Sequence, residues 1–506
     1  MTEKYLMKKY DDIVVGSGIS GMTLALLLGM NGHRVLLLEK NKNIGGSMAR
    51  FYKQGIPLDT GFHFTGGFYK NGILADMLTV LGISDQIQPI FIRESENKVI
   101  FEEDNSSYDF PFGYVETKAK MLEYFPNEKK AIDQYFDMVS DVCNKTVSLD
   151  LRNISLSHHW IDEDYVSLDE VLNKLTDNSR LKGLLSKYSM CYGVKPSEIS
   201  FANHSRVSFG LYESVARVKD GGDAFIRAFK KQLAGFDIDI RTESFITECA
   251  DINSNIVGRF VLNTGEEVLA DRCVFTIHPK AILDVLPAKY LTKAFVNRVS
   301  AFEPSVGFFA LFGIVRNYIP KDEDLEPTIL SLFPNTDMNR AMDPSYTGKP
   351  ALVILKNQDL VNWEKHMVIT ALEVSFLEHV SQWIDSEPGK RPESYQKYKK
   401  ERIENIMKRI FAAYPEYKDS FKLIDAASML TFKGYLNSPD GSAYGIKQKI
   451  GQFNLFGKLP IRNVYAAGQS AVLPGIVGAM LSSFITGRVV VGKDLYIDFI
   501  KKRLGS

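Results

Sequence analysis

Cysteine is scarce in this chain, and its spacing excludes two kinds of site. The four cysteines lie far apart in the 506-residue sequence, at Cys143, Cys191, Cys249 and Cys273. They form neither the close pairs of a metal or redox site nor the dense framework of a disulfide-rich secreted domain. We therefore expect no metal site, and we interpret the cysteines as buried thiols in a reducing compartment.

Net charge is also absent, because 61 lysines and arginines balance 61 aspartates and glutamates. This balance gives no indication of a nucleic-acid partner, and we expect none. The first ten residues lack the apolar core of a signal peptide. We predict a cytoplasmic protein, with peripheral contact to a membrane left open, and the sequence gives no indication of oligomeric state.

No apolar run is continuous enough to suggest a membrane span. Residues 463–487 carry no charge, but glycines, a proline and polar residues interrupt the middle of this stretch. A spanning helix needs about 20 consecutive, mostly apolar residues. Glycines interrupt residues 13–30 in the same way.

What the chain does contain is a complete dinucleotide-binding βαβ pattern at its start. An apolar strand leads into Gly16-Ser17-Gly18-Ile19-Ser20-Gly21, then a helical stretch and a second apolar strand that ends at Glu39. The first glycine permits a tight turn, the second lets the backbone approach a pyrophosphate, and the third allows close packing of helix on sheet. The helix N-terminus offers N–H groups to phosphates, and Glu39 can accept hydrogen bonds from ribose hydroxyls.

The residues after Glu39 favour FAD over a nicotinamide cofactor. Lys40 follows the acid, and Gly45-Gly46-Ser47 can form a turn close to the ribose and pyrophosphate. An extended FAD molecule needs several backbone segments to pass it closely. An ordinary flexible turn is the alternative interpretation.

A second cofactor segment is predicted near the other end of the chain. Residues 461–469 indicate a strand ending at Gly468 and Gln469, and residues 474–480 indicate the start of a helix rich in small residues. The free N–H groups of Gly475, Ile476 and Val477 would then lie beside the pyrimidine edge of a flavin, where negative charge accumulates on reduction.

Together these motifs resemble the flavin-dependent polyene oxidoreductases: phytoene desaturases, carotenoid isomerases and, most similar, the all-trans-retinol 13,14-saturases. The resemblance covers nearly the whole chain in the same order. It is carried by residues 58–64, 221–223, 441–445, 463–469 and 475–479. One departure is Ser470, where the saturases have an aspartate.

The resemblance implies an α/β fold of the amine-oxidase and phytoene-desaturase type. A Rossmann-like FAD-binding domain with a parallel sheet is expected in three pieces, residues 1–110, 206–285 and 426–506. An α+β substrate domain is expected to have a helical part over residues 111–205 and an antiparallel sheet with helices over residues 286–425. The backbone near Ile246 is expected to contact the adenine.

Local patterns add detail to this expectation. Helical spacing covers residues 118–143, and a long charged helix is predicted over residues 395–414, with a solvated or a lipid-facing surface. Strands of the antiparallel sheet are predicted at residues 306–315, 351–355 and 367–374. A hairpin is predicted between residues 260–262 and 267–269, followed by a parallel strand at residues 273–276.

The resemblance also implies the chemistry, namely FAD-dependent saturation, desaturation or isomerisation of carbon–carbon double bonds in a retinoid, carotenoid or similar apolar polyene. Saturation needs a proton donor next to the hydride acceptor. His63, which the saturases share, and Tyr444, which lies between two glycines, are the candidates, and a packing role is the alternative for each. Thr65 and Gly66 are expected to shape the flavin's surroundings, and Arg50 to meet a phosphate or face water.

Two other classes of protein share the expected fold. Amine oxidases often attach the flavin to a cysteine near the C-terminus, and no cysteine follows Cys273, which excludes such attachment. Prenyl- or lipid-binding modules without flavin have a degraded glycine pattern, whereas Gly16, Gly18, Gly21 and Glu39 are intact here.

Overall fold

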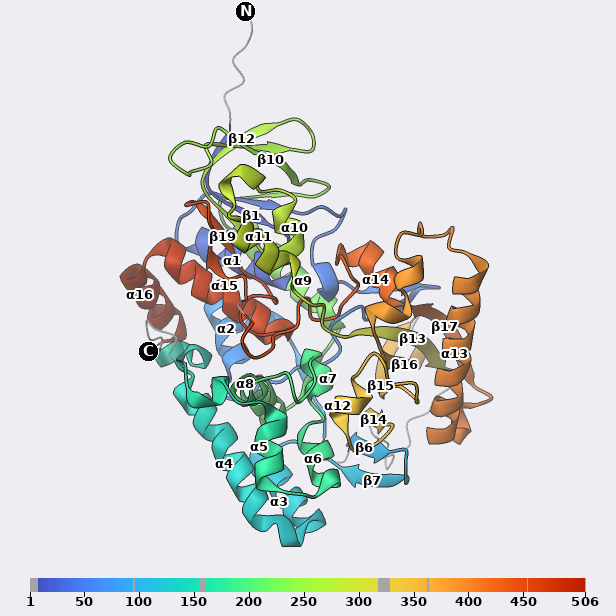
Figure 1. The fold of residues 1–506 in the computed structure, drawn as a ribbon. Helices are drawn as coiled ribbons and strands as arrows, with labels where there is room; N and C mark the ends of the chain where they lie inside the picture. The colour runs from blue at the N-terminus through green and yellow to red at the C-terminus, as the bar shows by residue number, and fades with distance from the viewer. Residues whose placement is uncertain are drawn as a thin grey trace, which may run out of the picture.

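The computed structural model describes residues 8–93, 96–153, 160–316, 328–361, 364–452 and 454–505. Residues 1–7, for which we predict no signal peptide, lie outside this range. Figure 1 shows three regions, with the first sheet and its helices at the upper left, a helical region below them and a second sheet on the right.

The first sheet is parallel at its centre and is assembled from separate parts of the chain. Its parallel strands lie in the order β9 (Ile238–Arg241), β2 (Val35–Leu38), β1 (Lys8–Val15), β12 (Glu267–Phe275) and β19 (Val464–Ala466). The antiparallel strands β10 (Ile246–Ala250), β11 (Arg259–Leu262) and β18 (Gly457–Lys458) extend it. The predicted hairpin strand and the predicted parallel strand after it are one strand, β12.

Helices cover both faces of this sheet because its central strands are apolar on both sides. In β2, Val35 and Leu37 face one layer while Leu36 and Leu38 face the other, and all four are buried. The first layer contains α1 (Ile19–Met30), α2 (Ile73–Leu81), α9 (Gly221–Leu233), α15 (Gly475–Val491) and α16 (Lys493–Leu504). The second contains α10 (Pro279–Leu283) and α11 (Lys293–Ser300). The apolar stretches at residues 13–30 and 463–487 therefore form helices and strands of this core.

The second sheet is largely antiparallel. Its order is β17 (Phe421–Ala427), β13 (Gly307–Val315), β16 (Glu364–Ser375), β15 (Leu352–Val361), β14 (Ile329–Phe333), β6 (Asn97–Phe101) and β7 (Ser106–Asp109). The strands predicted near residues 306–315, 351–355 and 367–374 are confirmed as β13, β15 and β16. The boundary predicted at residue 110 is wrong, because β6 pairs with β14 and so joins residues 97–109 to this sheet. The other boundaries stay predictions.

The long helix predicted over residues 395–414 is confirmed as α13 (Glu393–Ala413), which lies along the second sheet (Figure 1). Arg402 and Arg409 point inward and form ion pairs of 2.7 and 3.3 Å with the buried Glu373 of β16. Lys397 and Lys400 remain exposed. Part of the charge of α13 therefore pairs with a buried carboxylate in the core. The prediction of a solvated or a lipid-facing surface did not include this role.

The helical region packs around buried aromatic side chains such as Tyr135, Phe136 and Tyr212. It contains α3 (Tyr114–Tyr124), α4 (Lys129–Lys145), α5 (Leu168–Leu175), α6 (Ser179–Leu185), α7 (Ser189–Tyr192) and α8 (Phe201–Glu213). The helical spacing over residues 118–143 belongs to two helices, because Pro126 begins a short 3-10 turn between them.

The shorter strands and α-helices are β3 (Phe51–Lys53), β4 (Ile56–Leu58), β5 (Pro89–Phe91), β8 (Ala216–Val218), α12 (Met338–Ala341) and α14 (Met429–Leu436), and short 3-10 turns lie between the elements. Among the described residues, no helix combines the length and apolarity needed to cross a membrane. The same residues contain no cluster of His, Cys, Asp or Glu that could hold a metal ion.

Candidate functional site

The three glycines of the first βα turn have three different surroundings. Gly16 adopts a φ of +97°, which favours glycine. A Cβ on Gly21 would lie 1.8 Å from the carbonyl oxygen of Gly16, so only glycine lets α1 start this close to the strand. A Cβ on Gly18 would have no atom within 4 Å. The space beside Gly18 is therefore open to a ligand, which is what the predicted approach to a pyrophosphate requires.

Glu39 lies at the tip of β2, beside the same turn. Its buried carboxylate accepts hydrogen bonds from the N–H and hydroxyl of Ser17 and from the N–H of Asn41. Its carbonyl accepts a bond of 2.9 Å from Ser244, two residues before Ile246. The strand tip, the glycine turn and the start of β10 are therefore held together.

The second glycine pair packs against the first glycine turn. Gly45 and Gly46 have φ angles of +119° and +53°, and the N–H of Gly45 donates to the carbonyl of Ser17 over 3.0 Å. A Cβ on Gly46 would lie 3.2 Å from Cα of Gly18. These contacts pack the second glycine-rich segment against the first.

Three predicted cofactor residues show other contacts for their side chains. The hydroxyl of Ser20 lies 2.6 Å from that of Ser483 on α15. The exposed Lys40 lies over the Phe245 ring, 5.4 Å from its centroid. Ile246 is buried in β10. Any cofactor contact of Ser20 or Ile246 would be made by the backbone.

A cavity of about 620 Å³ adjoins these segments. On the cofactor side it is lined by the predicted residues Ile19, Ser47, His63, Thr65, Gly66, Gln469, Gly475, Ile476 and Val477. On the opposite side lie Phe308 of β13, Val353 of β15 and Leu372 of β16. The starts of α1 and α15 and the neighbouring loops thus supply one wall of the cavity, and the second sheet supplies an apolar wall.

The N-terminus of α15 opens toward this cavity. Gly475 has a φ of +77° and open space at its Cβ position, whereas a Cβ on Gly478 would lie 2.0 Å from the carbonyl oxygen of Leu473. The N–H of Gly468 donates to the hydroxyl of Ser482 over 2.8 Å, which ties β19 to the helix. The first turn of α15 therefore presents backbone N–H groups at the cavity.

His63 lines the cavity, and its Nδ1 has no hydrogen-bond partner among the described residues. Burial lowers the pKa of His63, and the charge of Asp59 opposes this shift in part. Asp59 is itself paired with Arg50 over 2.7 Å, with both side chains buried. The Arg50 guanidinium therefore offsets the buried Asp59 carboxylate and does not face water, whereas its contact with a phosphate stays a prediction.

Tyr444 lines the same cavity from the C-terminal part of the chain. Its ring packs edge-on against Phe308, with 6.4 Å between centroids, and a Cβ on Gly193 would touch it at 2.8 Å. Burial raises the pKa of Tyr444 well above its usual value. The phenol therefore keeps its proton at neutral pH.

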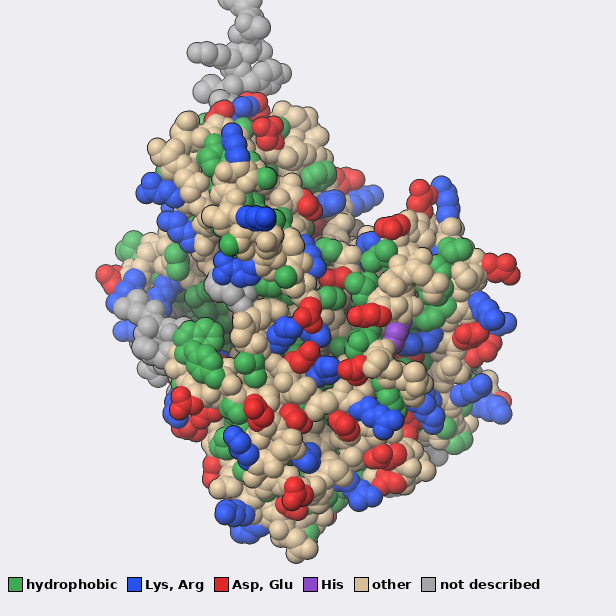
Figure 2. All heavy atoms as spheres, viewed as in Figure 1, with side chains coloured by type: hydrophobic (Ala, Val, Ile, Leu, Met, Phe, Trp, Pro, Cys, Tyr) green, Lys and Arg blue, Asp and Glu red, His purple; other side chains and the backbone are tan. Residues whose placement is uncertain are grey.

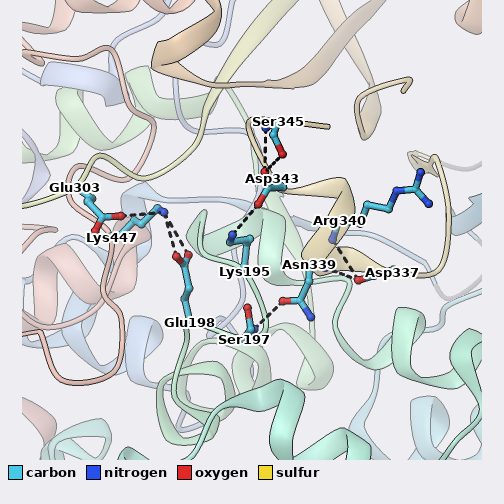
Figure 3. Close-up of polar contacts among 10 residues, drawn as sticks. All are labelled: Lys195, Ser197, Glu198, Glu303, Asp337, Asn339, Arg340, Asp343, Ser345 and Lys447. Atoms are coloured by element: carbon cyan, nitrogen blue, oxygen red, sulfur yellow. Dashed lines mark hydrogen bonds and ion pairs between the residues drawn. The ribbon is translucent and has the colours of Figure 1, made fainter. Parts of the chain in front are cut away.

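A set of polar contacts holds the segment that carries Tyr444. Its N–H donates to the hydroxyl of Ser305 over 3.1 Å, and Lys447 lies 3.3 Å from Glu198 and 3.2 Å from Glu303. Figure 3 shows Lys447 between these two carboxylates, with the pair Lys195–Asp343 nearby. Ser470, the position that departs from the saturases, lies next to Gly445, where a Cβ would be 2.3 Å from its hydroxyl oxygen.

The predicted residues Thr65 and Gly66 shape the wall between the cavity and the helical region. The N–H of Thr65 pairs with Ala216 in β8, and a Cβ on Gly66 would lie 2.3 Å from the carbonyl oxygen of Gly210 in α8. Gly66 is thus needed for close packing on α8.

Several cavity residues were not predicted as site residues. They come from the helical region and the second sheet: Cys143, Asn144, Asp150, Met190, Cys191, Arg206, Phe308, Val353 and Leu372. No short motif marks them, because the cavity is formed by elements far apart in the sequence.

Comparison with known proteins places the chain among its relatives. The NAD(P)-binding Rossmann-like domain matches residues 14–80. The chain is 26% identical to all-trans-retinol 13,14-reductase of Macaca fascicularis, over 99% of this chain and 88% of that protein. It is 32% identical to prolycopene isomerase 2, chloroplastic, of an Oncidium hybrid cultivar, over 29% of this chain and 25% of that protein.

The chain is a homologue of the retinol saturases and carotenoid isomerases. The resemblance predicted from the motifs is thereby confirmed. Among solved structures, cyclohexylamine oxidase from Brevibacterium oxydans IH-35A matches with a TM-score of 0.60 and 14% identity, over 98% of this chain and 100% of that chain. This likeness confirms the predicted amine-oxidase type of fold.

Proposed function

We propose that this protein is an FAD-dependent oxidoreductase that saturates, desaturates or isomerises carbon–carbon double bonds of an apolar polyene, such as a retinoid or carotenoid. The observation that supports this most is the cavity between the glycine-rich segments and the apolar wall of Phe308, Val353 and Leu372. An elongated hydrocarbon could lie along this wall next to the cofactor-side residues.

The residues around the cavity and the glycine turns fit the parts of FAD. The open space at Gly18, next to Gly46, leaves room for a pyrophosphate, and the buried Glu39 carboxylate at the strand tip suits a ribose. The first turn of α15, at Gly475, Ile476 and Val477, would face the flavin ring. When bound, FAD supplies the transfer of a hydride to or from carbon.

The two candidate acid–base residues differ in protonation. Tyr444 holds its proton because burial raises its pKa, so it can donate at its hydroxyl during saturation. His63 is neutral at pH 7 because burial lowers its pKa, and its Nδ1 has no partner among the described residues. We therefore assign Tyr444 as the proton donor in saturation and His63 as the proton acceptor in desaturation. The apolar wall excludes water and aligns the chain.

The test is to identify the bound cofactor and the substrate class together. Purified protein is denatured and the released cofactor is identified by chromatography, and intact protein is then incubated with all-trans-retinol, a carotenoid extract or cyclohexylamine. The proposal predicts FAD and a polyene product. Conversion of the amine alone would favour an amine oxidase, and absence of any flavin would favour a lipid-binding module.

A further inference from the structure

The C-terminal end of α14 and the residues after it lie against the cofactor side of the molecule. The carbonyl of Tyr435 accepts a hydrogen bond of 3.3 Å from the side-chain amide of Asn41, and the side-chain amide of Asn437 donates to Oδ1 of Asn41 over 3.1 Å. Asn41 lies two residues after Glu39, the residue proposed to bind the ribose. One end of this segment is therefore fastened beside the end of β2.

The same segment reaches the end of β12 at Asp440. The Oδ2 atom of the buried Asp440 lies 3.8 Å from Nε2 of His278, which follows the last residue of β12 by three positions. The Nδ1 of His278 accepts a hydrogen bond from the N–H of Lys280, so Nε2 carries the proton of the neutral ring. Burial lowers the pKa of His278 against the opposing charge of Asp440, so the ring is neutral at pH 7 and this contact is weaker than an ion pair.

These two contacts lie on either side of β1, because β2 and β12 are its neighbours in the sheet. Neighbouring strands lie about 4.8 Å apart, so two spacings are about 10 Å, which is also about the reach of three extended residues. The three strands are parallel, so their carboxyl ends lie at one edge of the sheet, where ligands of such sheets bind. Residues 437–440 therefore cross in front of the glycine turn that follows β1.

The cavity lies between this segment and the cofactor side. Its lining includes Leu436 and Ser442 from the segment and Ile19 and Ser47 from the cofactor side. A Cβ on Gly18 would have no atom within 4 Å, so the segment crosses the glycine turn without filling the space beside it. Figure 2 shows a notch between the upper-left and right-hand parts of the molecule, in the area that α14 occupies in Figure 1.

The segment is held more firmly at its C-terminal end than over the glycine turn. Gly441 has a φ of +72°, and a Cβ there would lie 2.2 Å from the carbonyl oxygen of Met429 at the start of α14. The N–H of Ala443 donates to the carbonyl of Val306 over 3.0 Å. Over the glycine turn, by contrast, the segment has the exposed hydrogen bonds of Asn41 and the contact with a neutral imidazole. Exposed hydrogen bonds contribute little net free energy, so this part can lift while its anchors stay in place.

We propose that residues 435–442 form a strap that closes over bound FAD and must lift for FAD to enter or leave. The strap rests on the proposed cofactor but not on the proposed reaction. Its hydrogen bonds to Asn41 join protein groups and are present in the flavin-free structure. Loosening them should therefore raise the rates of FAD binding and FAD release by the same factor and leave the Kd nearly unchanged.

The test measures FAD binding and release with the full chain, by stopped-flow flavin fluorescence and without substrate. Asn41→Ala removes both hydrogen bonds to the strap and keeps the backbone N–H that donates to Glu39. Both rates should rise about fivefold, with the Kd within about twofold of the wild type. Asn173→Ala on α5 also removes an exposed asparagine with two side-chain hydrogen bonds, and as the matched control it should change neither rate.

Asn437→Gly loosens the same contact from the strap, and glycine accepts the φ of +53° found there, so both rates should rise in this variant as well. A faster release with an unchanged binding rate would overturn the proposal, because it would mean that Asn41 contacts FAD directly. Unchanged rates in both variants would also overturn it. A chain that binds no FAD would overturn the proposed cofactor together with the strap, whereas FAD binding at unaltered rates would overturn the strap alone.

Discussion

Gly18 and Gly21 are three residues apart, yet the structure predicts opposite effects for the same substitution. In Gly21→Ala the new Cβ would lie 1.8 Å from the Gly16 carbonyl oxygen, so helix and strand must separate. Such overpacking costs about 1–3 kcal/mol or more. In Gly18→Ala the Cβ meets no atom within 4 Å, and the backbone at φ −61° and ψ 179° suits alanine. The free energy of unfolding should therefore stay within about 0.5 kcal/mol of the wild type.

The affinity for FAD should be affected more by Gly18→Ala than by Gly21→Ala. A methyl group at Gly18 would keep the pyrophosphate from the backbone and remove hydrogen bonds to a charged group, at about 1.5–3 kcal/mol. That corresponds to about a 10- to 150-fold higher Kd for FAD. Gly18→Asp adds charge repulsion and should abolish binding.

The assay combines thermal unfolding of the flavin-free protein with FAD titration followed by flavin fluorescence. Gly18→Ala should keep the wild-type Tm and lose affinity, whereas Gly21→Ala should lower the Tm of the flavin-free protein. Wild-type FAD affinity in Gly18→Ala would refute the placement of the pyrophosphate, and an equal loss of Tm in both variants would refute the packing argument.

Three further predictions follow from the site and the helical core. Tyr444→Phe should retain flavin and slow saturation by at least about 100-fold, measured by product chromatography, and a wild-type rate would place the proton donor elsewhere. Desaturation activity should fall at a pH below 6.5, because His63 becomes protonated as the pH drops through its lowered pKa and can then no longer accept a proton. His63→Gln should abolish this acid limb of the pH profile. His204 is buried between Tyr135 and Tyr192, and burial lowers its pKa to about 3. Neutral His204 therefore contributes fully to the free energy of unfolding above pH 6.5, and this free energy should decrease by roughly 2 kcal/mol by pH 5, as measured by urea unfolding. A smaller pH dependence of stability in His204→Gln would support this prediction, and an unchanged pH dependence would contradict it.

The cofactor side of the molecule could be predicted from the sequence because its determinants are local. The turn glycines, Glu39 and the start of α15 each lie in a short segment whose pattern indicates one backbone conformation. The structure packs Gly46 on Gly18 and places Ile19, Ser47 and Gly475 on the lining of one cavity. Strand positions in the second sheet were also predictable from runs of apolar residues.

The substrate side could not be predicted because its contacts join distant residues. The pairing of β6 with β14 links Asn97 to Ile329, and no local pattern specifies it. The ion pair of Arg50 with Asp59 forms because both side chains are buried next to each other, which the sequence does not reveal. Phe308 and Cys191 become cavity residues only after the helical region packs on the second sheet.

The most direct test of the account is the visible spectrum of the purified protein during anaerobic reduction, followed by addition of all-trans-retinol or a carotenoid extract. Bound flavin should bleach on reduction and be reoxidised by the polyene in the absence of oxygen, with formation of a saturated product. Bound flavin that no polyene reoxidises would contradict the saturase direction, and protein that binds no flavin would contradict the account as a whole.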